Sequence, residues 1–236
     1  GSVQGEATLG AVSPMPLQAR LRINSERIQG WPISAGIEVS GPLTHLAATI
    51  EGSAGTLPFS AQLELVPFED EPVKTLVARS SAVDMAAFDA RLPATTLVVE
   101  LRAQLRGFDS LIGEVSVNNP QPGPVDRKRL PLKALHSKFI ADGNALELQD
   151  ATLDLEDAGE AAGRASYRDG LLELDVDVRR LDLRSLYGSL RATRLSGNIR
   201  VEGGKERQRV AARLREANLS FEGEALIAER RVRIER

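Results

Sequence analysis

Apolar and polar residues alternate along most of this chain. The segment Leu172–Arg179 has an aliphatic residue at every second position and a charged residue at each position between. A period of two is the signature of a β-strand with one apolar and one polar face. Runs of about five to eight such residues, separated by Gly- and Pro-containing turns, predict about thirteen to fifteen strands. No amphipathic stretch is long enough for a helical crossover, so we expect successive strands to be antiparallel.

One stretch of the chain occurs twice. Val83–Arg102 reads VDMAAFDARLPATTLVVELR, Leu181–Arg200 reads LDLRSLYGSLRATRLSGNIR, and the two align without a gap. Self-similarity of this kind indicates that one structural unit is repeated. Each copy predicts a strand end, a short helical segment capped by an aspartate, and a new strand. Six positions are identical in both copies: Asp84 and Asp182, Leu92 and Leu190, Ala94 and Ala192, Thr95 and Thr193, Leu97 and Leu195, Arg102 and Arg200.

The repeat also predicts how the chain is organised. We expect one continuous repeating β-groove over residues 3–236, with sub-blocks at about 3–82, 83–180 and 181–236. The stretch 118–129 holds three Pro and one Gly before a small basic cluster, and it is the best candidate for a loop or linker. Residues 1–2 have the form of a tag scar. The strand pattern is still running at the last residue, so we interpret the chain as an interior piece of a longer protein.

The aliphatic face of the predicted sheet needs a cover, because burying the charged face unpaired would be costly. A β-sandwich would cover it with a second sheet. The alternative is one long sheet curled into a trough. Aromatic residues make up only 4% of the chain, which is few for a sandwich core, and an open-ended repeat is typical of solenoid-like sheets. We therefore predict an all-β fold: a long curled antiparallel sheet that forms an apolar groove, with short helical segments between repeat blocks.

The residues expected to line the groove are aliphatic positions of the clearest strands. An ordinary packed core has the same pattern, so periodicity alone does not separate the two interpretations. The repeat further predicts that matching positions of the two copies line one continuous wall. The predicted lining residues are Leu97, Val99, Leu101, Leu172, Leu174, Val176, Val178, Leu195, Ile199, Val201 and Leu214.

Few residues suggest catalysis or a bound metal or cofactor. The chain has no Cys, which excludes thiolate chemistry, and its two histidines, His45 and His136, have no local cluster of partner residues. The carboxylates of residues 173–177 project in parallel from one strand, so we expect a solvated face rather than a cation site. One Trp and two Tyr are too few for the aromatic platforms of a glycosidase. We expect no enzymatic activity, no cofactor and no metal site.

The net charge of −3 argues against a nucleic-acid partner. The sign varies along the chain, because residues 191–236 hold 12 Lys and Arg against 7 acids, whereas residues 142–182 hold 12 acids against 4 Arg. This asymmetry would help successive segments to pair or would attract anionic headgroups, and a mixed solvated face is the interpretation we favour. No apolar run reaches the length of a membrane-spanning helix.

The second copy of the repeat resembles segments of TamB-like proteins, the large periplasmic relatives of the AsmA group. The resemblance lies in the motif Leu-Asp-Leu, short helix, Leu-x-Ala-Thr-x-Leu-Ser-Gly at Leu181–Gly197, and in phrases such as VSGPL at Val39–Leu43. The first copy departs from it, with Val98 and Val99 in place of Ser-Gly. The resemblance implies a β-taco fold in a Gram-negative envelope protein. That protein would lie in the periplasm, be anchored in the inner membrane at full length, and have an outer-membrane barrel partner of the TamA type.

Pattern and resemblance together predict a hydrophobic-groove segment that conducts phospholipids between the inner and outer membranes, with phospholipid acyl chains as its ligands. The alternative is a scaffold or chaperone for the assembly or secretion of outer-membrane β-barrel proteins. In that case the sheet edges would pair with an incoming strand by β-augmentation.

Overall fold

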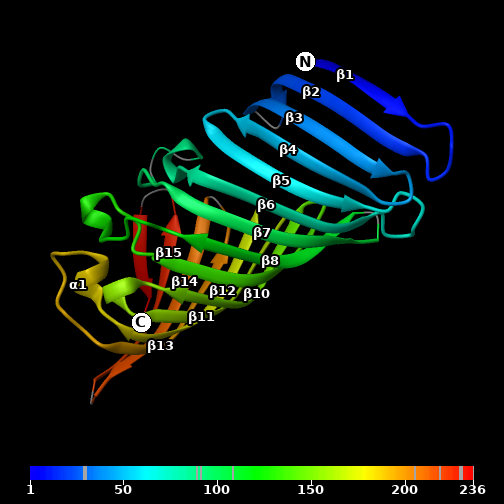
Figure 1. Ribbon diagram of the computed structural model, residues 1–236. Coiled ribbons are helices and arrows are strands. Elements are labelled where there is room, and N and C mark those ends of the chain that lie inside the picture. The colour runs from blue at the N-terminus through cyan, green and yellow to red at the C-terminus, as the bar shows by residue number, and fades with distance from the viewer. Residues whose placement is uncertain are drawn as a thin grey trace. The chain divides into compact units, whose positions relative to one another are not determined.

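The computed structural model describes residues 1–28, 31–88, 90, 92–107, 109–204, 206–217, 219–228 and 231–235. Within these ranges the chain forms sixteen β-strands, and their order in the sheet is their order in the sequence. Strands β1 to β7 pair antiparallel with their chain neighbours, and so do β9 to β16 (Figure 1). The predicted all-β, antiparallel fold class is confirmed. The strands are β1 (Ser2–Leu9), β2 (Pro16–Ile28), β3 (Trp31–Pro42), β4 (Leu46–Ala54), β5 (Leu57–Leu65), β6 (Val73–Val83), β7 (Leu97–Arg106), β8 (Ser110–Asn118), β9 (Ala134–Asp142), β10 (Ala145–Asp154), β11 (Glu160–Arg168), β12 (Leu171–Leu181), β13 (Leu195–Gly203), β14 (Arg207–Glu216), β15 (Leu219–Ala228) and β16 (Arg231–Glu235).

Four short helical segments interrupt the strands. They are the 3-10 helices η1 (Met85–Ala87), η2 (Val125–Arg127) and η3 (Glu156–Ala158), and the α-helix α1 (Leu183–Leu186). Each connects an even-numbered strand to the next odd-numbered one. In an antiparallel sheet such connections fall at the same side of the sheet. Figure 1 shows η2, η3 and α1 gathered at one end of the strands around them.

The contacts between Cα atoms divide the chain into two compact units. Unit 1 comprises Gly1–Asp84 and Thr96–Glu114, and unit 2 comprises Met85–Thr95 and Val115–Arg236. Strands β1 to β7 therefore belong to unit 1 and β9 to β16 to unit 2, while β8 contributes to both. The loop or linker predicted at 118–129 falls inside unit 2 and contains η2.

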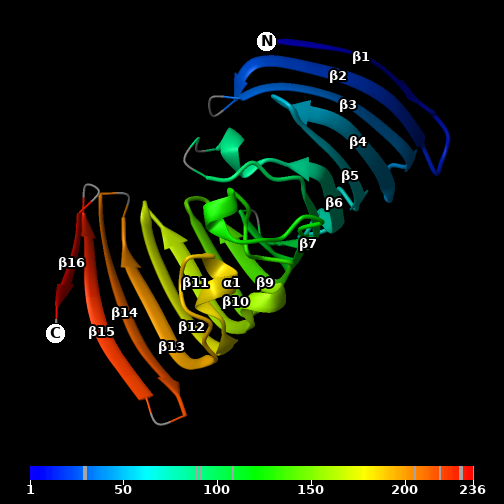
Figure 2. The ribbon, with the colours of Figure 1, turned by 90° about the vertical axis from the view of Figure 1, so that its left-hand side faces the viewer.

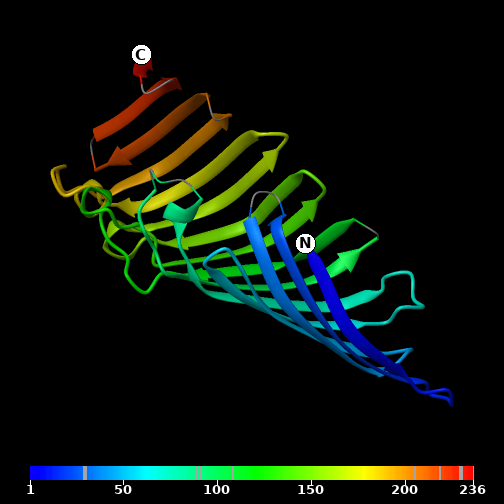
Figure 3. The ribbon, with the colours of Figure 1, turned by 90° about the horizontal axis from the view of Figure 1, so that it is seen from above.

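The strands of unit 1 lie side by side in one sheet (Figure 3). Strand register brings aliphatic residues opposite one another across the sheet. One row runs through Leu21, Ile37, Ile50, Ala61 and Ala78, and each member lies directly opposite the next. Because side chains alternate between faces, the neighbouring positions of these strands place their polar residues on the other face.

Unit 2 has the same construction. Its strands bend along their length, as Figure 2 shows for β11 to β15. A row of aliphatic residues again crosses the sheet, through Ala165, Leu174, Val201, Val210 and Ala225. Bending brings side chains on the inner side of a sheet closer together, so small and aliphatic residues suit that side.

Two features of the sheet escape simple alternation. The first strand, β1, was not predicted, because its aliphatic positions include the weak strand residues Gly5 and Ala7. In β10 the aliphatic pattern changes phase, and the sequence predicts a strand edge at Leu146 and Leu148, followed by a separate aliphatic run at Ala151, Leu153 and Leu155. The structure instead has one strand with a register shift between Leu148 and Ala151, where Asp150 adopts a φ of 51°. This irregularity returns the following residues to the aliphatic face.

The two repeat copies form matching structures. Val83 pairs with Leu97 between β6 and β7, and Leu181 pairs with Leu195 between β12 and β13. Both pairings follow a register shift at the same place in the repeat. The repeat is therefore a structural unit as well as a sequence pattern. We call residues 83–97 the first seam and residues 181–195 the second seam.

Each unit is a single layer of sheet. Among the described residues, the extensive strand contacts are all between neighbours in the sheet. The chain exposes 16325 Å² of surface at a mass of 25.5 kDa. A compact protein of this mass exposes about 10,400 Å², and two separate compact domains of half the mass expose about 12,500 Å² together. The excess is what a sheet leaves exposed when no second layer packs on its aliphatic face.

Candidate functional site

The candidate site of unit 2 is the aliphatic face of β12, β13 and β14. Register places Leu174 opposite Val201 and Val176 opposite Ile199. On the next strand, Leu214 lies opposite Gly197. The structure thus brings together on one face the eight predicted lining residues of unit 2: Leu172, Leu174, Val176, Val178, Leu195, Ile199, Val201 and Leu214.

These eight residues differ in how deeply they are buried. Val176, Val178 and Leu195 are buried, whereas the other five, among them Leu174 and Val201, are only half-buried. No large side chain in the described part of the chain is fully buried. A packed core buries aliphatic residues almost completely, so this face differs from a closed core.

The deepest part of this face lies under the second seam. Val178 and Leu195 form a buried cluster with Ala161 and Leu181, and the α1 residues Leu183 and Leu186 pack against it. The sequence predicts that the segment Asp182–Ser189 covers or stiffens the apolar wall, but it does not identify Leu183 and Leu186 as the side chains that do so. The residues of the face nearer the opposite, hairpin side are more open, since Leu146 is 42% exposed and Tyr167 is 45% exposed.

In unit 1 the predicted lining residues Leu97, Val99 and Leu101 share one face of β7. Leu101 lies opposite Ala78, and Leu97 lies opposite Val83. Leu97 is buried, and Val99 and Leu101 are half-buried. Along β7 this face is therefore buried at Leu97 and more open at Val99 and Leu101.

The polar face of unit 2 is held together by charge pairs across neighbouring strands. Asp175 on β12 lies between Arg164 on β11, at 3.5 Å, and Arg200 on β13, at 3.4 Å. The Asn198 amide donates to Asp175 Oδ1 at 2.8 Å, and this hydrogen bond and the two arginines lower the pKa of Asp175. Exposed pairs such as these contribute about 0–1 kcal/mol each. The pair of Asp175 with Arg200 joins the acidic stretch of the sequence to the basic one. Glu173 and Asp177 are exposed, whereas Asp175 is half-buried between its partners.

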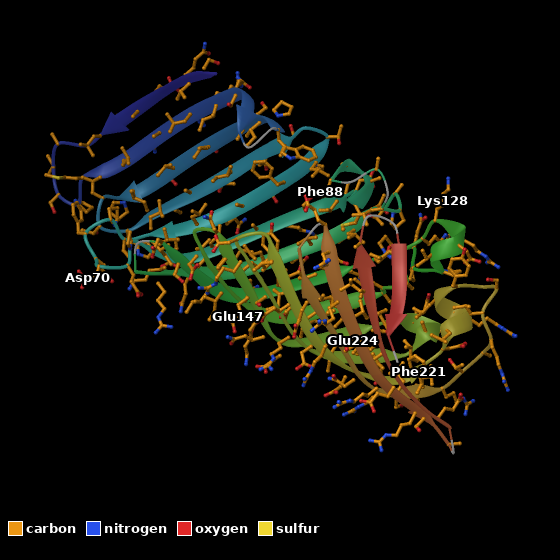
Figure 4. All side chains as sticks on the ribbon, turned by 180° about the vertical axis from the view of Figure 1, so that it is seen from behind. Asp70, Phe88, Lys128, Glu147, Phe221 and Glu224 are labelled. Carbon is orange, nitrogen blue, oxygen red and sulfur yellow. The ribbon has the colours of Figure 1, made fainter. Side chains whose placement is uncertain are left out.

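Further charge pairs follow the strand register in both units. Arg213 pairs with Glu222 at 2.6 Å in unit 2, and Arg79 pairs with Glu100 at 3.4 Å in unit 1. Both pairs join residues directly opposite each other on neighbouring strands. Their arrangement favours one strand register over its neighbours, because a slip of one residue would move each charge to the aliphatic face. Glu147 on β10 and Glu224 on β15 are labelled in Figure 4.

In each seam a backbone N–H at the start of the helical segment donates to the hydroxyl of a threonine near the next strand, and we call this hydrogen bond the latch. In the second seam, the Thr193 hydroxyl accepts from the Leu183 N–H at 3.0 Å and donates to the Leu181 carbonyl at 2.9 Å. The Thr193 N–H donates to Asp182 Oδ1 at 2.9 Å, which lowers the pKa of Asp182. The Arg184 N–H and the Ser185 hydroxyl, both at 3.1 Å, lower it further. Thr193 and Asp182 are therefore structural residues that fix the path of the second seam.

The stretch predicted as a loop or linker is fixed by one buried polar residue. Asn119 is 3% exposed, and its side chain donates to the Leu130 carbonyl at 3.2 Å and accepts from the Gln121 N–H at 3.1 Å. Its own N–H donates to the Lys133 carbonyl at 2.8 Å. The sequence analysis did not identify Asn119. Further along this loop, Asp126 Oδ2 accepts from the Gly188 N–H at 3.1 Å, which joins the loop to the second seam.

The two histidines lie on the surface. His45 Nε2 is 3.2 Å from Glu64, and both side chains are about half exposed. His136 is an exposed residue of β9, opposite Thr152. Neither position brings a histidine into a cleft with a nucleophile or a second carboxylate.

Comparison with known proteins identifies no relative of this chain. No protein-family model matches it, and neither the curated proteins nor the solved structures contain a match. No helix in the described part of the chain is long and apolar enough to cross a membrane.

Proposed function

We propose that this chain is a hydrophobic-groove segment that binds phospholipid acyl chains and conducts them between the inner and outer membranes of a Gram-negative envelope. The observation that carries the proposal is the half-buried aliphatic face that each unit presents without a second sheet over it. The periplasmic location, the inner-membrane anchor and an outer-membrane barrel partner of the TamA type rest on the resemblance of the repeat to TamB-like proteins.

The energetics of the face suit a ligand that moves. Each CH₂ removed from water contributes about 0.8 kcal/mol, so a 16-carbon chain with about half of its surface covered gains roughly 6 kcal/mol. The rows of aliphatic residues, such as Leu174, Val201 and Val210, are chemically uniform from strand to strand. Because neighbouring positions bind the chain about equally, it can pass between them without meeting a deep energy minimum.

The test uses charge substitutions on the aliphatic face. Leu174→Asp in unit 2 and Leu101→Asp in unit 1 each place a carboxylate where the acyl chain would lie. Thr152→Asp and Gln104→Asp, at exposed positions of the polar face, are the matched controls. After incubation with phospholipid, native mass spectrometry measures the lipid that each purified variant retains.

We expect the two leucine variants to lose bound lipid by about tenfold and the controls to retain it, because an unpaired carboxylate against an alkyl chain costs about 1–3 kcal/mol. Circular dichroism checks that all four variants are folded. A wild-type chain that retains no lipid, or controls that lose as much lipid as the leucine variants, would contradict the proposal. Crosslinking of unaltered sheet edges to barrel precursors would instead support the scaffold alternative.

A further inference from the structure

A patch of unpaired cations lies on the helical side of unit 2. Arg127 and Lys128 follow Asp126 in the η2 loop, and Arg191 and Arg194 lie in the second seam. The hydrogen bond from the Gly188 N–H to Asp126 at 3.1 Å holds the two loops against each other. All four cationic residues are exposed, and none has an ion-pair partner among the described residues. One carboxylate borders the patch, because Glu216 Oε1 accepts from the Arg194 N–H at 2.7 Å.

Exposed apolar residues accompany these cations. Val125 is 52% exposed beside Arg127, and Tyr187 and Leu190 are each 45% exposed beside Arg191. Lys128, labelled in Figure 4, extends from its loop away from the strands. Long basic side chains and tyrosine are suited to a boundary between alkyl chains and phosphate groups, because each has an apolar body and a polar tip. We call the four cations and these three apolar residues the cationic lip.

The opposite side of unit 2 has a different charge. Its two-residue turns carry Asp142 and Asp169, and near the β13–β14 connection lies Glu206. Arg168 and Arg207 are the cations at these turns in the described part of the chain. Among the described residues these turns carry three acids and two arginines, whereas the helical side holds four cations without an ion-pair partner. The helical side also carries acids, among them Asp126, Glu156 and Asp157.

The second seam connects the lip to the aliphatic face. The α1 residues Leu183 and Leu186 pack on the buried end of that face, and Tyr187 and Leu190 follow them directly in the chain. A lipid whose acyl chain lay along Val176 and Leu174 would thus extend its headgroup past α1 toward the lip.

We infer that the cationic lip binds the headgroups of anionic phospholipids whose acyl chains occupy the aliphatic face of unit 2. The inference rests on the proposed function and adds the lipid class: the segment selects anionic over zwitterionic phospholipids. Arginine and lysine supply the charge-assisted hydrogen bonds that phosphate oxygens accept.

The experiment measures selectivity and total binding separately. The purified chain is incubated with an equimolar mixture of phosphatidylglycerol and phosphatidylcholine, and native mass spectrometry counts each bound lipid. We expect the wild-type chain to retain mostly phosphatidylglycerol. The variants Arg127→Gln with Lys128→Gln, and Arg191→Gln with Arg194→Gln, should each lower the ratio of the two lipids by roughly 25-fold, or about fivefold per charge removed. Total lipid should stay the same.

The matched control is Arg168→Gln with Arg207→Gln, which makes the same change of charge on the other side of unit 2. It should leave the ratio within twofold of the wild-type value. Leu174→Asp should lower the retention of both lipids equally, which separates failure of the aliphatic face from failure of the lip. An equal effect of the control pair, or a wild-type ratio near one, would overturn the inference.

A second readout applies if the purified chain retains no lipid, an outcome that contradicts the proposed function. Flotation with phosphatidylglycerol vesicles then tests the lip alone. Preferential flotation with these vesicles over phosphatidylcholine vesicles, lost in the two lip variants, would support the headgroup site. Equal flotation of the lip variants and the control pair would overturn it.

Discussion

The two seams share a latch and differ in the residues they place beside it. In the first seam the Met85 N–H donates to the Thr95 hydroxyl at 2.9 Å, and in the second the Leu183 N–H donates to the Thr193 hydroxyl at 3.0 Å. The strand pairings next to them, Val83 with Leu97 and Leu181 with Leu195, also match. These are the features that the repeat conserves.

The differences lie in the helical segment and in the strand that follows it. The first seam has the 3-10 helix η1, and its Phe88 is 57% exposed, whereas the matching Leu186 of α1 packs on the buried cluster. Val99 of the first copy corresponds to Gly197, which has a φ of 151°. Figure 4 labels Phe88 on its seam.

The comparison separates two tasks within one repeat. The threonine hydroxyl holds the start of the helical segment in both copies, and in the second copy Asp182 adds hydrogen bonds from the Thr193 and Arg184 N–H groups. The cover over the aliphatic face depends on the side chains after the aspartate, and these vary. One repeat can therefore combine the same chain path with different side chains over the aliphatic face.

The largest expected effect comes from giving the second copy the residue of the first. Gly197→Val should lower the free energy of unfolding by about 3 kcal/mol or more, because a Cβ at Gly197 would collide with the Arg213 carbonyl and a φ of 151° strains other residues. Urea denaturation measures the loss. Gly36→Val is the matched control, since a Cβ there meets nothing nearer than 3.9 Å. If both variants are equally stable, the backbone of β14 does not approach Gly197 as closely as the structure shows.

The next effect tests the cover. Leu186→Ala should cost about 2 kcal/mol, because it removes a partly buried side chain from the cluster of Ala161, Val178, Leu181 and Leu195. Phe88→Ala, at the matching but exposed position, should cost less than half as much. Thermal unfolding of both variants measures the contrast. Equal losses would mean that the two seams cover their faces alike.

The sequence predicted those parts of the fold that depend on local periodicity. Strands such as β7 and β12 were predicted because their side chains alternate without interruption, and the repeat was visible because the latch needs aspartate and threonine at fixed positions. The bulge at Asp150 was missed, because one added residue reverses the phase of a period-two pattern. Only the pairing of β10 with both β9 and β11 shows that its two aliphatic runs belong to one strand.

The sequence predicted which residues of the candidate site share one face of a strand, but not which residues of the next strand lie beside them. Alternation placed Leu174 and Val176 on the same side of one strand, and register then brought Val201 and Ile199 beside them. The repeat predicts that the seam segment covers or stiffens the wall, but the side chains that do so, Leu183 and Leu186, were not predictable, because a four-residue helix has no periodicity that shows which side it packs against. The cationic lip depends on one long-range hydrogen bond, from Gly188 to Asp126, that no local pattern encodes.

A smaller effect tests the part that both seams share. Thr193→Val keeps the shape of the side chain and removes the hydroxyl, which leaves the Leu183 N–H and the Leu181 carbonyl without that partner. We expect a loss of about 1.5 kcal/mol, and a similar loss for Thr95→Val. Thr49→Val, at an exposed position of β4, should be neutral within about 0.5 kcal/mol. Urea denaturation that found the latch variants as stable as the control would show that the conserved threonines do not hold the seams.

The smallest effect depends on pH. The pKa of Asp182 is lowered in the folded chain by the N–H groups of Thr193 and Arg184 and by the Ser185 hydroxyl. A lowered pKa means that the charged form is favoured by folding, so its contribution to stability is complete above the unfolded value of about 3.9 and is lost as the pH falls through the folded pKa.

Asp182→Asn keeps an acceptor oxygen without the charge. It should cost about 1 kcal/mol or less at pH 7, because hydrogen bonds to a charged acceptor are about twice as strong as neutral ones. The difference between wild type and variant should then shrink toward zero below pH 3. Urea denaturation at pH 7, 4 and 2.5 measures this, and a difference that stays constant across the series would show that the charge of Asp182 does not stabilise the second seam.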